Sequence, residues 1–468
     1  MSDSFRIEYD TMGSVKVPAT AYYGAQTQRA VENFQISGMV FPRRFIRALG
    51  IVKKTSAIVN MELGLLDEKT GSVIVAAAQE VVDGKFDHQF ILDIFQTGSG
   101  TSTNMNANEV IANRAIELLG GTRGDKRLVH PNDHVNMSQS TNDAFPTAIH
   151  IATLEALVTD LLPALKSLLL ALENKAAEFT DVVKSGRTHL QDAVPMTLGQ
   201  EFSGYASLIS HGIERIEKAK TSLLELPIGG TAVGTGLNAH PDFGRLVVAR
   251  INEITGFAFR TSKNRFEALQ GADAAVEASG ALRSVAVSLM KIANDLRLLS
   301  SGPTTGLAEI QLPAVQPGSS IMPGKVNPVI PEAVNMVSAQ VLGNDLAITL
   351  AGQSGLLELN TMMPLIAFDL LQSVAIEARA AGLLADKCVN GIIADRKRCL
   401  EYAERSYGLA TAIAPSIGYD RAAKLVQKAR EESKSIRQVM VEEGISREQV
   451  DRILDLEKLT KGGRLSRT

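Results

Sequence analysis

The sequence predicts a mainly α-helical protein built around a bundle of long helices. Apolar residues recur at helical spacing over five unusually long segments, and alanine, leucine and valine dominate the stripes that they form. Hydrophobic residues make up 45% of the 468-residue chain, which is enough for a large core. A chain of this length is expected to form several domains or one very extended helical body.

The first part of the chain is expected to be mostly helical, with a small β-containing entry. Residues 6–18 predict two short extended pieces around a Met-Gly turn. Apolar positions then recur at helical spacing over residues 42–84, and residues 87–94 lead into a glycine-rich loop. We expect this N-terminal domain to cover residues 1–139.

A central bundle is expected over residues 140–392, and the more charged residues 393–468 predict a small C-terminal helical domain. Pro163 should kink the first long helix, and Gly280 is a candidate for close packing in the third. Several helices are apolar around much of their circumference, which predicts an oligomer. The five helical patterns cover residues 146–179, 192–224, 265–300, 331–352 and 364–392.

Composition excludes several classes of partner. The 48 Lys and Arg against 51 Asp and Glu leave a net charge of −3, which argues against nucleic acid or an anionic membrane as the main partner. Cys388 and Cys399 suggest buried thiols, because two cysteines make no disulfide framework or thiolate cage. The N-terminus lacks a basic segment followed by an apolar core, and no uninterrupted apolar run reaches membrane-spanning length. We therefore expect a cytoplasmic protein.

The segment GSSIMPGKVNPVIPE, residues 318–332, concentrates reactive groups in a loop rich in glycine and proline. A helix is expected to begin near Pro331, with Glu332 at the positive end of its dipole. Backbone N–H groups, Lys325 and Asn327 could together hold a carboxylate or a developing oxyanion. On these residues alone, a glycine-rich surface turn remains an open alternative.

Three further loops also have small polar side chains just before the start of a predicted helix. They span residues 96–109, 130–146 and 185–195. Ordinary helix capping would also explain the first two, and a lone histidine in the third is more often structural than catalytic. The candidate groups are Ser99, Thr101 and Asn104, then Ser140, Thr141 and Asn142, and finally Thr188 and His189.

The four loops together contain hydroxyls, amides, one histidine and one lysine, but no carboxylate pair, no cysteine and no evident metal cluster. No Walker lysine motif and no GxGxxG after a strand is present, so no nucleotide or other cofactor is expected. The set suits recognition of a small dianion and stabilisation of charge that grows on one carboxylate.

At this point the chain resembles the fumarase and aspartase superfamily, from RIEYDTMG at residue 6 to SIGYDRAAKL at residues 416–425. The motifs that carry the resemblance are GSSIMPGKVNP, TGSGTSTNMNANEV, SQSTNDAFPT and GRTHLQDAVP. The resemblance implies a three-domain fold whose long helices form the core of a homotetramer, with each active site assembled from three subunits. It also implies an anti elimination beside a carboxylate, through a dianionic aci-carboxylate intermediate.

The family's pattern also implies roles for individual residues. Ser319 would be the general base, and His189, paired with Glu332, would donate a proton or position water. Lys325 would supply positive charge to the intermediate. The positions that match substrate contacts are Ser99, Gly100, Thr101, Ser140, Thr141, Asn142, Thr188, Ser320 and Asn327.

Two branches of the superfamily remain to be separated. TGSG at 97–100, GGTAVGTG at 229–236, RFEAL at 265–269 and VHPND at 129–133 are similar to class II fumarases, which interconvert fumarate and malate in the tricarboxylic acid cycle. The features that lean towards aspartate ammonia-lyase are His134, Thr141, NPVIPE at 327–332 and LRLLSSGP at 296–303. We expect a fumarate hydratase, with the ammonia-lyase as the alternative.

Two further expectations follow from the resemblance. The residues that match a second, non-catalytic dicarboxylate site of fumarases are Arg127, His130, Asn132 and Asp133; the alternative is a polar loop that traps anions by chance. A structural relative that has lost catalysis is a remote alternative. The presence of Ser319, His189, Lys325, Asn327 and Glu332 speaks against it.

Overall fold

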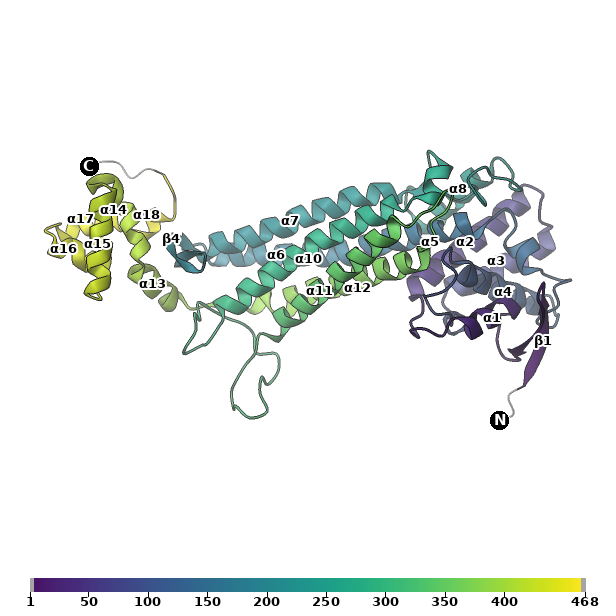
Figure 1. Cartoon of the computed structure of the whole chain (residues 1–468), viewed down its shortest axis with the longest axis horizontal. Helices are drawn as coiled ribbons and strands as arrows, with labels where there is room; N and C mark the ends of the chain where they lie inside the picture. The colour runs from purple at the N-terminus through teal and green to yellow at the C-terminus, as the bar shows by residue number, and fades with distance from the viewer. Residues whose placement is uncertain (1–3, 464–468) are drawn as a thin grey trace. The chain divides into compact units, whose positions relative to one another are not determined.

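The computed structural model describes residues 4–463 and is dominated by long helices (Figure 1). Contacts divide the chain into two compact units. Among the described residues, unit 1 comprises those up to Pro163, Glu214–Ser284 and Ala339–Ala378, and unit 2 comprises Ala164–Ile213, Val285–Ser338 and those from Arg379 on. The three-domain division at 139/140 and 392/393 stays a prediction.

Unit 1 begins with an antiparallel hairpin of β1 (Phe5–Asp10) and β2 (Gly13–Pro18), which confirms the two predicted extended pieces. The remaining elements that lie wholly in this unit are α1 (Ala25–Asn33), α2 (Arg43–Glu62), α3 (Glu68–Val82), the short η1 (Asp87–Gln89), α4 (Thr101–Leu118), the π-helical turn η2 (Pro131–Val135), α5 (Thr141–Ala156), the π-helical η3 (Leu157–Leu161), α8 (Phe243–Thr255), α9 (Arg265–Gln270), and the parallel pair β5 (Glu225–Leu226) and β6 (Arg260–Thr261).

The core of unit 1 lies between α2, α3 and α4. Ile74 and Ala77 of α3 and Val110 and Ile111 of α4 are completely buried in one hydrophobic cluster. Their helical spacing places them on the inward stripes, so periodicity in residues 42–84 correctly predicted helical structure there. Asp67 caps α3 by accepting the N–H of Thr70 at 2.9 Å, which sets where that helix begins.

Unit 2 contains the antiparallel hairpin β3 (Val183–Thr188) and β4 (Gln191–Thr197) and a cluster of short helices near the C-terminus. Its other complete elements are β7 (Ile310–Gln311) paired with β8 (Ile393–Ala394), η4 (Val389–Gly391), α13 (Arg396–Arg405), η5 (Tyr407–Leu409), α14 (Ala410–Ile417), α15 (Tyr419–Glu431), α16 (Ile436–Glu442), α17 (Arg447–Ile453) and α18 (Leu456–Leu459). Ala429, Val439 and Leu454 are completely buried in the core of these helices.

Each of four long helices contributes residues to both units: α7 (Leu198–Leu223), α10 (Asp273–Leu299), α11 (Val329–Gly352) and α12 (Met363–Lys387). The continuous helix formed by α5, η3 and α6 (Leu162–Glu178) does the same. The five predicted long helices are therefore confirmed, with corrected bounds.

The corrections have local causes. Residues 192–197 form strand β4, so the second long helix begins later than expected. The third is interrupted at Gly271, between α9 and α10, and α11 begins at Val329, ahead of Pro331. Pro163 is expected to kink the first long helix; the helix continues past it and widens into the π-helical η3 just before it. The prediction that Gly280 is a close-packing position is wrong within residues 4–463. A Cβ added there would meet only Arg283, at 3.8 Å.

The helix Thr141–Glu178 is long and apolar enough to cross a membrane, judged by length and composition alone. The expectation concerns uninterrupted apolar runs, and this helix is interrupted by Asp143, Glu155 and Asp160. The most apolar 18-residue stretch of this helix, with a mean hydropathy of 1.5, is 61% buried inside the structure. Core helices that are covered on several sides have this same composition.

Candidate active site

The loop before α4 carries Ser99, Gly100 and Thr101, and it is shaped by close contact with α5. Gly100 caps α4 with φ +82°, and a Cβ there would lie 2.3 Å from the ring of Phe145. Only glycine satisfies both conditions. The buried hydroxyl of Ser99 and the hydroxyl of Thr101 share a hydrogen bond of 2.8 Å. The two hydroxyls therefore lie together at the positive end of a helix.

A capping box positions Ser140, Thr141 and Asn142 at the start of α5. Ser140 Oγ accepts the N–H of Asn142 at 3.2 Å, and Asp143 accepts the N–H of Ser140 at 2.9 Å. The second carboxylate oxygen of Asp143 accepts the N–H groups of Gly229 and Thr231 at 3.0 and 2.9 Å. Burial raises the pKa of Asp143 to about 6, and the three N–H donors oppose that rise.

Three loops of unit 1 therefore meet at one place. Asn142 Nδ2 donates to the carbonyl of Ala232 at 2.8 Å, and Asn104 Nδ2 donates to Thr141 Oγ1 at 3.0 Å. The structure thus brings together Ser99 to Asn104, Ser140 to Asn142 and the segment 229–232. Asp143 and the 229–232 backbone were missed as site components, although the pattern Ser140-x-x-Asp143 is a sequence signal for a capping box.

The residues predicted to form a second anion site lie around η2, also in unit 1. His130 Nδ1 accepts the N–H groups of Asn132 and Asp133, each at 3.2 Å, so this nitrogen carries no proton. Burial lowers the pKa of His130, which also favours the neutral ring. A neutral ring makes no ion pair with Asp133, 3.4 Å away. Arg127 is highly exposed and pairs with Asp125 at 2.8 Å. The second site stays a prediction.

His189 lies at the tip of the β3–β4 hairpin in unit 2, in a strained turn. Thr188 pairs with Gln191, and the two turn residues His189 and Leu190 have φ of +54° and +59°. Non-glycine residues rarely adopt this region, at a cost of about 1–3 kcal/mol each, and such strain is concentrated at functional sites. Both side chains are exposed, and Leu190 is 69% accessible. The hairpin presents an imidazole and an apolar side chain outward.

A buried ion cluster holds the base of this hairpin. Glu309 is completely buried and accepts Arg187 Nη1 at 3.0 and 2.9 Å. Lys184 Nζ lies 3.4 Å from the same carboxylate and 2.8 Å from Glu201. Two cations against two carboxylates leave no unpaired buried charge. The buried ion cluster therefore fixes the base of the hairpin whose turn is strained.

The loop that contains Ser319 is closed at its neck by backbone contacts. Gly318 N–H donates to the carbonyl of Lys325 at 2.8 Å, and Asn327 Nδ2 donates to the carbonyl of Gly318 at 2.5 Å. A Cβ on Gly318 would lie 2.4 Å from the Lys325 carbonyl oxygen, so the neck requires glycine. The loop is exposed at its tip, where Ile321 is 83% accessible.

Two backbone N–H groups point at the hydroxyl of Ser319. Ser319 Oγ accepts the N–H of Ile321 at 3.2 Å and the N–H of Met322 at 2.9 Å. Donors in this arrangement stabilise negative charge on the oxygen that accepts them. A serine hydroxyl that accepts the N–H groups two and three residues further on also occurs in ordinary turns, so this geometry fits both the surface turn and the anion-stabilising loop.

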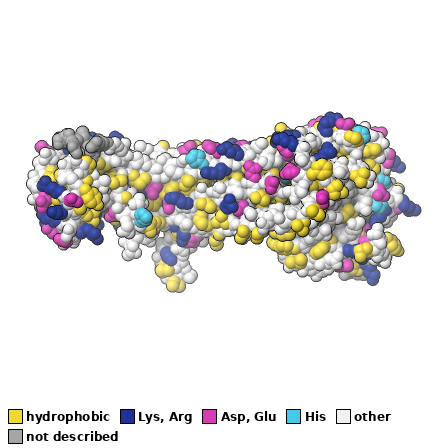
Figure 2. Space-filling model, turned by 45° about the horizontal axis from the view of Figure 1, so that its top comes forward, with side chains coloured by type: hydrophobic (Ala, Val, Ile, Leu, Met, Phe, Trp, Pro, Cys, Tyr) yellow, Lys and Arg dark blue, Asp and Glu magenta, His cyan; other side chains and the backbone are white. Residues whose placement is uncertain are grey.

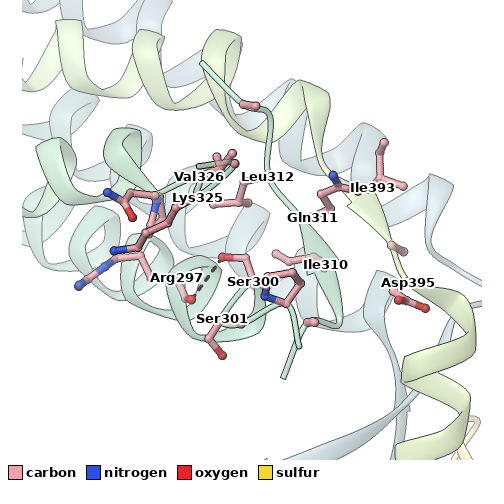
Figure 3. Close-up of a pocket in the computed structure, with 18 of the residues that line it drawn as sticks. Arg297, Ser300, Ser301, Ile310, Gln311, Leu312, Lys325, Val326, Ile393 and Asp395 are labelled. Carbon is pink, nitrogen blue, oxygen red and sulfur yellow. Dashed lines mark hydrogen bonds between the residues drawn. The ribbon is translucent and has the colours of Figure 1, made fainter. Parts of the chain in front are cut away.

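A cavity of about 910 Å³ lies beside this loop, within unit 2 (Figure 3). Lys325 and Asn327 line it together with Arg297, and Ile310 and Leu312 add apolar surface. Neither Lys325 nor Arg297 forms an ion pair within residues 4–463. The cavity therefore offers two unpaired cations to an anion.

The predicted site residues thus fall into separate groups. Unit 1 holds the hydroxyl and amide groups at the starts of α4 and α5, and unit 2 holds His189, the Ser319 loop and Glu332 in the first turn of α11. Within residues 4–463, no hydrogen bond or ion pair joins His189 to Glu332 or to Ser319. The His189–Glu332 pairing stays a prediction.

Comparison with known proteins identifies the family. The family model described as lyase matches residues 13–343, and the one described as fumarase C C-terminus matches residues 409–461. A class II fumarate hydratase of Nitrosomonas europaea is 52% identical over 460 residues, which cover 98% of this chain and 100% of that protein. The chain belongs to the class II fumarase family.

The fold of this family agrees with the structure. A recombinant class II fumarase from Schistosoma mansoni matches with a TM-score of 0.95 at 41% identity, covering 98% of this chain and 99% of that one. An aspartate ammonia-lyase of Bacillus sp is also 50% identical over 464 residues, covering 99% of each chain. The class II fumarate hydratases at 52–54% identity support a hydro-lyase, and the ammonia-lyase is a minor alternative.

We predict that Gly318→Ala lowers turnover about 10²-fold, because the new Cβ opens the neck and misplaces Ser319. Melting temperature should stay close to that of the unchanged protein, since the loop is exposed. Steady-state assays and thermal denaturation measure the two effects. Gly204→Ala is the matched control, because Gly204 is exposed on α7 with nothing within 4 Å of an added Cβ. Full activity in Gly318→Ala would contradict the role of the neck.

Proposed function

We propose that the chain is a fumarate hydratase, which adds water reversibly and in the anti sense to fumarate to give (S)-malate. The observation that carries the reaction type is the cradle of two N–H groups on Ser319 Oγ, in a chain 52% identical to a class II fumarate hydratase. The segments 97–100, 229–236 and 265–269, similar to fumarases, favour water over ammonia.

In the direction of dehydration, the Ser319 hydroxyl first loses its proton to solvent, and the resulting alkoxide removes the proton beside a carboxylate. Serine is a poor base in water, because its alkoxide is unstable there. The N–H groups of Ile321 and Met322 stabilise that alkoxide, and closure of the exposed loop over the substrate would exclude water from it. The loop tip, with Ile321 and Met322 exposed, has apolar surface to bury on closure.

Loss of this proton leaves an aci-carboxylate dianion, which Lys325 and Asn327 stabilise. The Lys325 ammonium is exposed and has no ion pair within residues 4–463, so its charge is available to the substrate. Asn327 uses its side-chain amide to bond the Gly318 carbonyl, which orients the group beside Lys325. A fixed cation and fixed donors favour the charge that develops in the transition state over that of the substrate.

The second carboxylate of the substrate is held by the hydroxyl and amide groups of unit 1. Ser140 Oγ and Thr141 Oγ1 already accept hydrogen bonds, so their own protons are free to be donated to a carboxylate. Ser99, Gly100, Thr101 and Asn142 add donors at the two helix N-termini. Thr188 and Ser320 complete the substrate contacts in this proposal.

His189 and Glu332 act at the hydroxyl that leaves. Imidazole can protonate the departing hydroxide or position the attacking water, because its charge changes near neutral pH. Glu332 would orient the ring and balance its charge. Because the two side chains have no contact within the described chain, the proposal pairs them between subunits.

We propose a homotetramer with each active site shared by three subunits. Supporting this, α11 exposes Met336, Leu346 and Leu350, which are 68, 61 and 49% accessible. These lie on one face of the helix, and an added Cβ on Gly343, on the same face, would meet nothing within 4 Å. Figure 2 shows hydrophobic side chains gathered on the displayed surface. Such a face fits a second copy of the same helix.

In the same proposal, Arg127, His130, Asn132 and Asp133 form a second dicarboxylate site. His130 would have to turn from its capping role, or donate through Nε2, to bind an anion. Arg127 would exchange Asp125 for the ligand. The change at Arg127 is small, since its side chain is 90% exposed.

Aspartate ammonia-lyase is the second candidate, because one relative with that name is 50% identical to the chain. The same base and aci-carboxylate would serve either reaction, and only the leaving group differs. Loss of catalysis is the remote alternative, and the intact cradle on Ser319 argues against it.

Purified protein should convert malate to fumarate and leave aspartate unchanged, because the site resembles that of hydratases. The absorbance of the fumarate double bond in the ultraviolet measures both reactions in parallel cuvettes. Activity on aspartate alone would replace the hydratase with the ammonia-lyase. No activity on either substrate would favour the non-catalytic relative.

Ser319→Ala should lower kcat about 10²–10⁴-fold, because it removes the general base while the loop neck remains. Sedimentation should show the same oligomer as the unchanged protein. Ser203→Ala is a matched control, since that hydroxyl on α7 bonds only the Gln200 carbonyl within the described chain. Unchanged turnover in Ser319→Ala would reject the assignment of the base.

A further inference from the structure

A buried lysine lies beside the loop that leads into the start of α5, where Ser140, Thr141 and Asn142 form what we term the substrate-binding cap of unit 1. Lys53, in the middle of α2, is 0% exposed. Its ammonium donates to Asn136 Oδ1 at 3.0 Å and to Gln139 Oε1 at 2.9 Å. Both acceptors belong to the loop that leads into Ser140. The mechanism proposed above does not use this lysine.

A chain of hydrogen bonds connects Lys53 to the cap. Asn136 Oδ1 also accepts Asn104 Nδ2 and Asn108 Nδ2 from α4, each at 3.2 Å. Asn104 Nδ2 in turn donates to Thr141 Oγ1 at 3.0 Å. The ammonium, the start of α4 and the start of α5 therefore share one acceptor, Asn136. Movement of Lys53 would be transmitted to both helix starts that hold the substrate.

The surroundings of Lys53 leave its charge without a direct counterion. Its hydrogen-bond partners are neutral amides, and α4 adds the neutral Asn104 and Asn108. Among residues 4–463, Asp143 of α5 is the carboxylate that acts on it. Within the described chain, no titratable group of α3, α8 or η2, which also pack against α2, acts on it, Asp133 and His134 of η2 included. Asp143 is occupied by three backbone N–H groups.

The neighbouring amides add a second sign of incomplete pairing. The Oδ1 atoms of Asn104 and Asn108 are buried and have no hydrogen-bond partner among residues 4–463. Buried polar atoms without partners are costly, and their presence marks a network that a ligand completes or reorganises. Burial lowers the pKa of Lys53 to about 7, while the charge of Asp143 opposes that change.

We propose that Lys53 is a positioning residue for the substrate-binding cap. A dicarboxylate that binds at the cap stabilises the protonated, positively charged form of this buried lysine. The inference rests on the proposed function only for the identity of the dianion. Two negative charges at the Ser140–Asn142 cap favour the ammonium over the amine. The free protein, in which part of the Lys53 population is neutral, therefore takes up a proton as the ligand binds.

Proton uptake on ligand binding depends on pH, because it requires Lys53 to be partly neutral in the free protein. In the free protein Lys53 is half protonated near pH 7 and charged well below it. Bound dianion raises that pKa, so uptake is greatest between pH 7 and the raised value and vanishes at lower pH. At pH 7 the uptake should reach about half a proton per site.

Calorimetric titration of the full protein with succinate tests this, because succinate is a dicarboxylate with no group to eliminate. Titrations at pH 7 in two buffers of different ionisation enthalpy measure the protons taken up. Lys53→Met should abolish the proton uptake and weaken the binding of succinate about tenfold. It should also raise KM for fumarate about tenfold, with kcat changed by less than about threefold. Lys54→Met is the matched control, because Lys54, next in α2, bonds Gln79 and lies outside the network.

Gln139→Glu is the second variant, in case loss of the ammonium prevents folding. Its new carboxylate replaces the amide 2.9 Å from Lys53 Nζ and keeps the lysine charged in both free and bound protein, so uptake should again vanish. Uptake at the unchanged level in either folded variant overturns the proposal, as does absence of uptake in the unchanged protein. A protein that binds succinate with Lys53-dependent uptake but does not hydrate fumarate would sink the proposed function alone.

Discussion

Buried carboxylates that bind the backbone or a cation determine where the reactive loops of this protein lie. In unit 1, Asp143 binds three N–H groups from two separate segments, and in unit 2, Glu309 binds Arg187 beneath the His189 hairpin. Neither loop contains enough apolar side chains to hold its shape by packing. The helices supply a rigid frame, and these carboxylates connect the polar loops to it.

The helices could be predicted from the sequence because burial on one or more faces leaves a periodic apolar pattern, as in residues 42–84. The hairpin at Thr188–Gln191 could not, because its turn contains His189 and Leu190 in place of the asparagine or glycine that normally marks such a turn. Tertiary support from Glu309 overrides that local preference. The apolar spacing of residues 192–197 predicts a helix where the structure has strand β4.

The site was predicted in a similarly uneven way. Glycine, serine and asparagine at predicted helix starts located the loops, and the capping box at Ser140 followed the expected local chemistry. The cradle on Ser319 and the role of Lys53 depend on which backbone and amide groups meet in three dimensions, and residue spacing does not encode those contacts. The proposed pairing of His189 with Glu332 depends on another subunit, so the residue pattern of a single chain does not predict it.

The central proposal is that each active site is shared between copies of the chain, with Ser319 and His189 supplied by different copies. Hybrids of Ser319→Ala and His189→Asn, co-expressed with two tags and purified by both, test it directly. The account predicts that hybrids regain activity, up to about a quarter of the unchanged protein's in a random mixture, although each parent variant is inactive. Hybrids that contain both variants but are no more active than the parents would contradict the account.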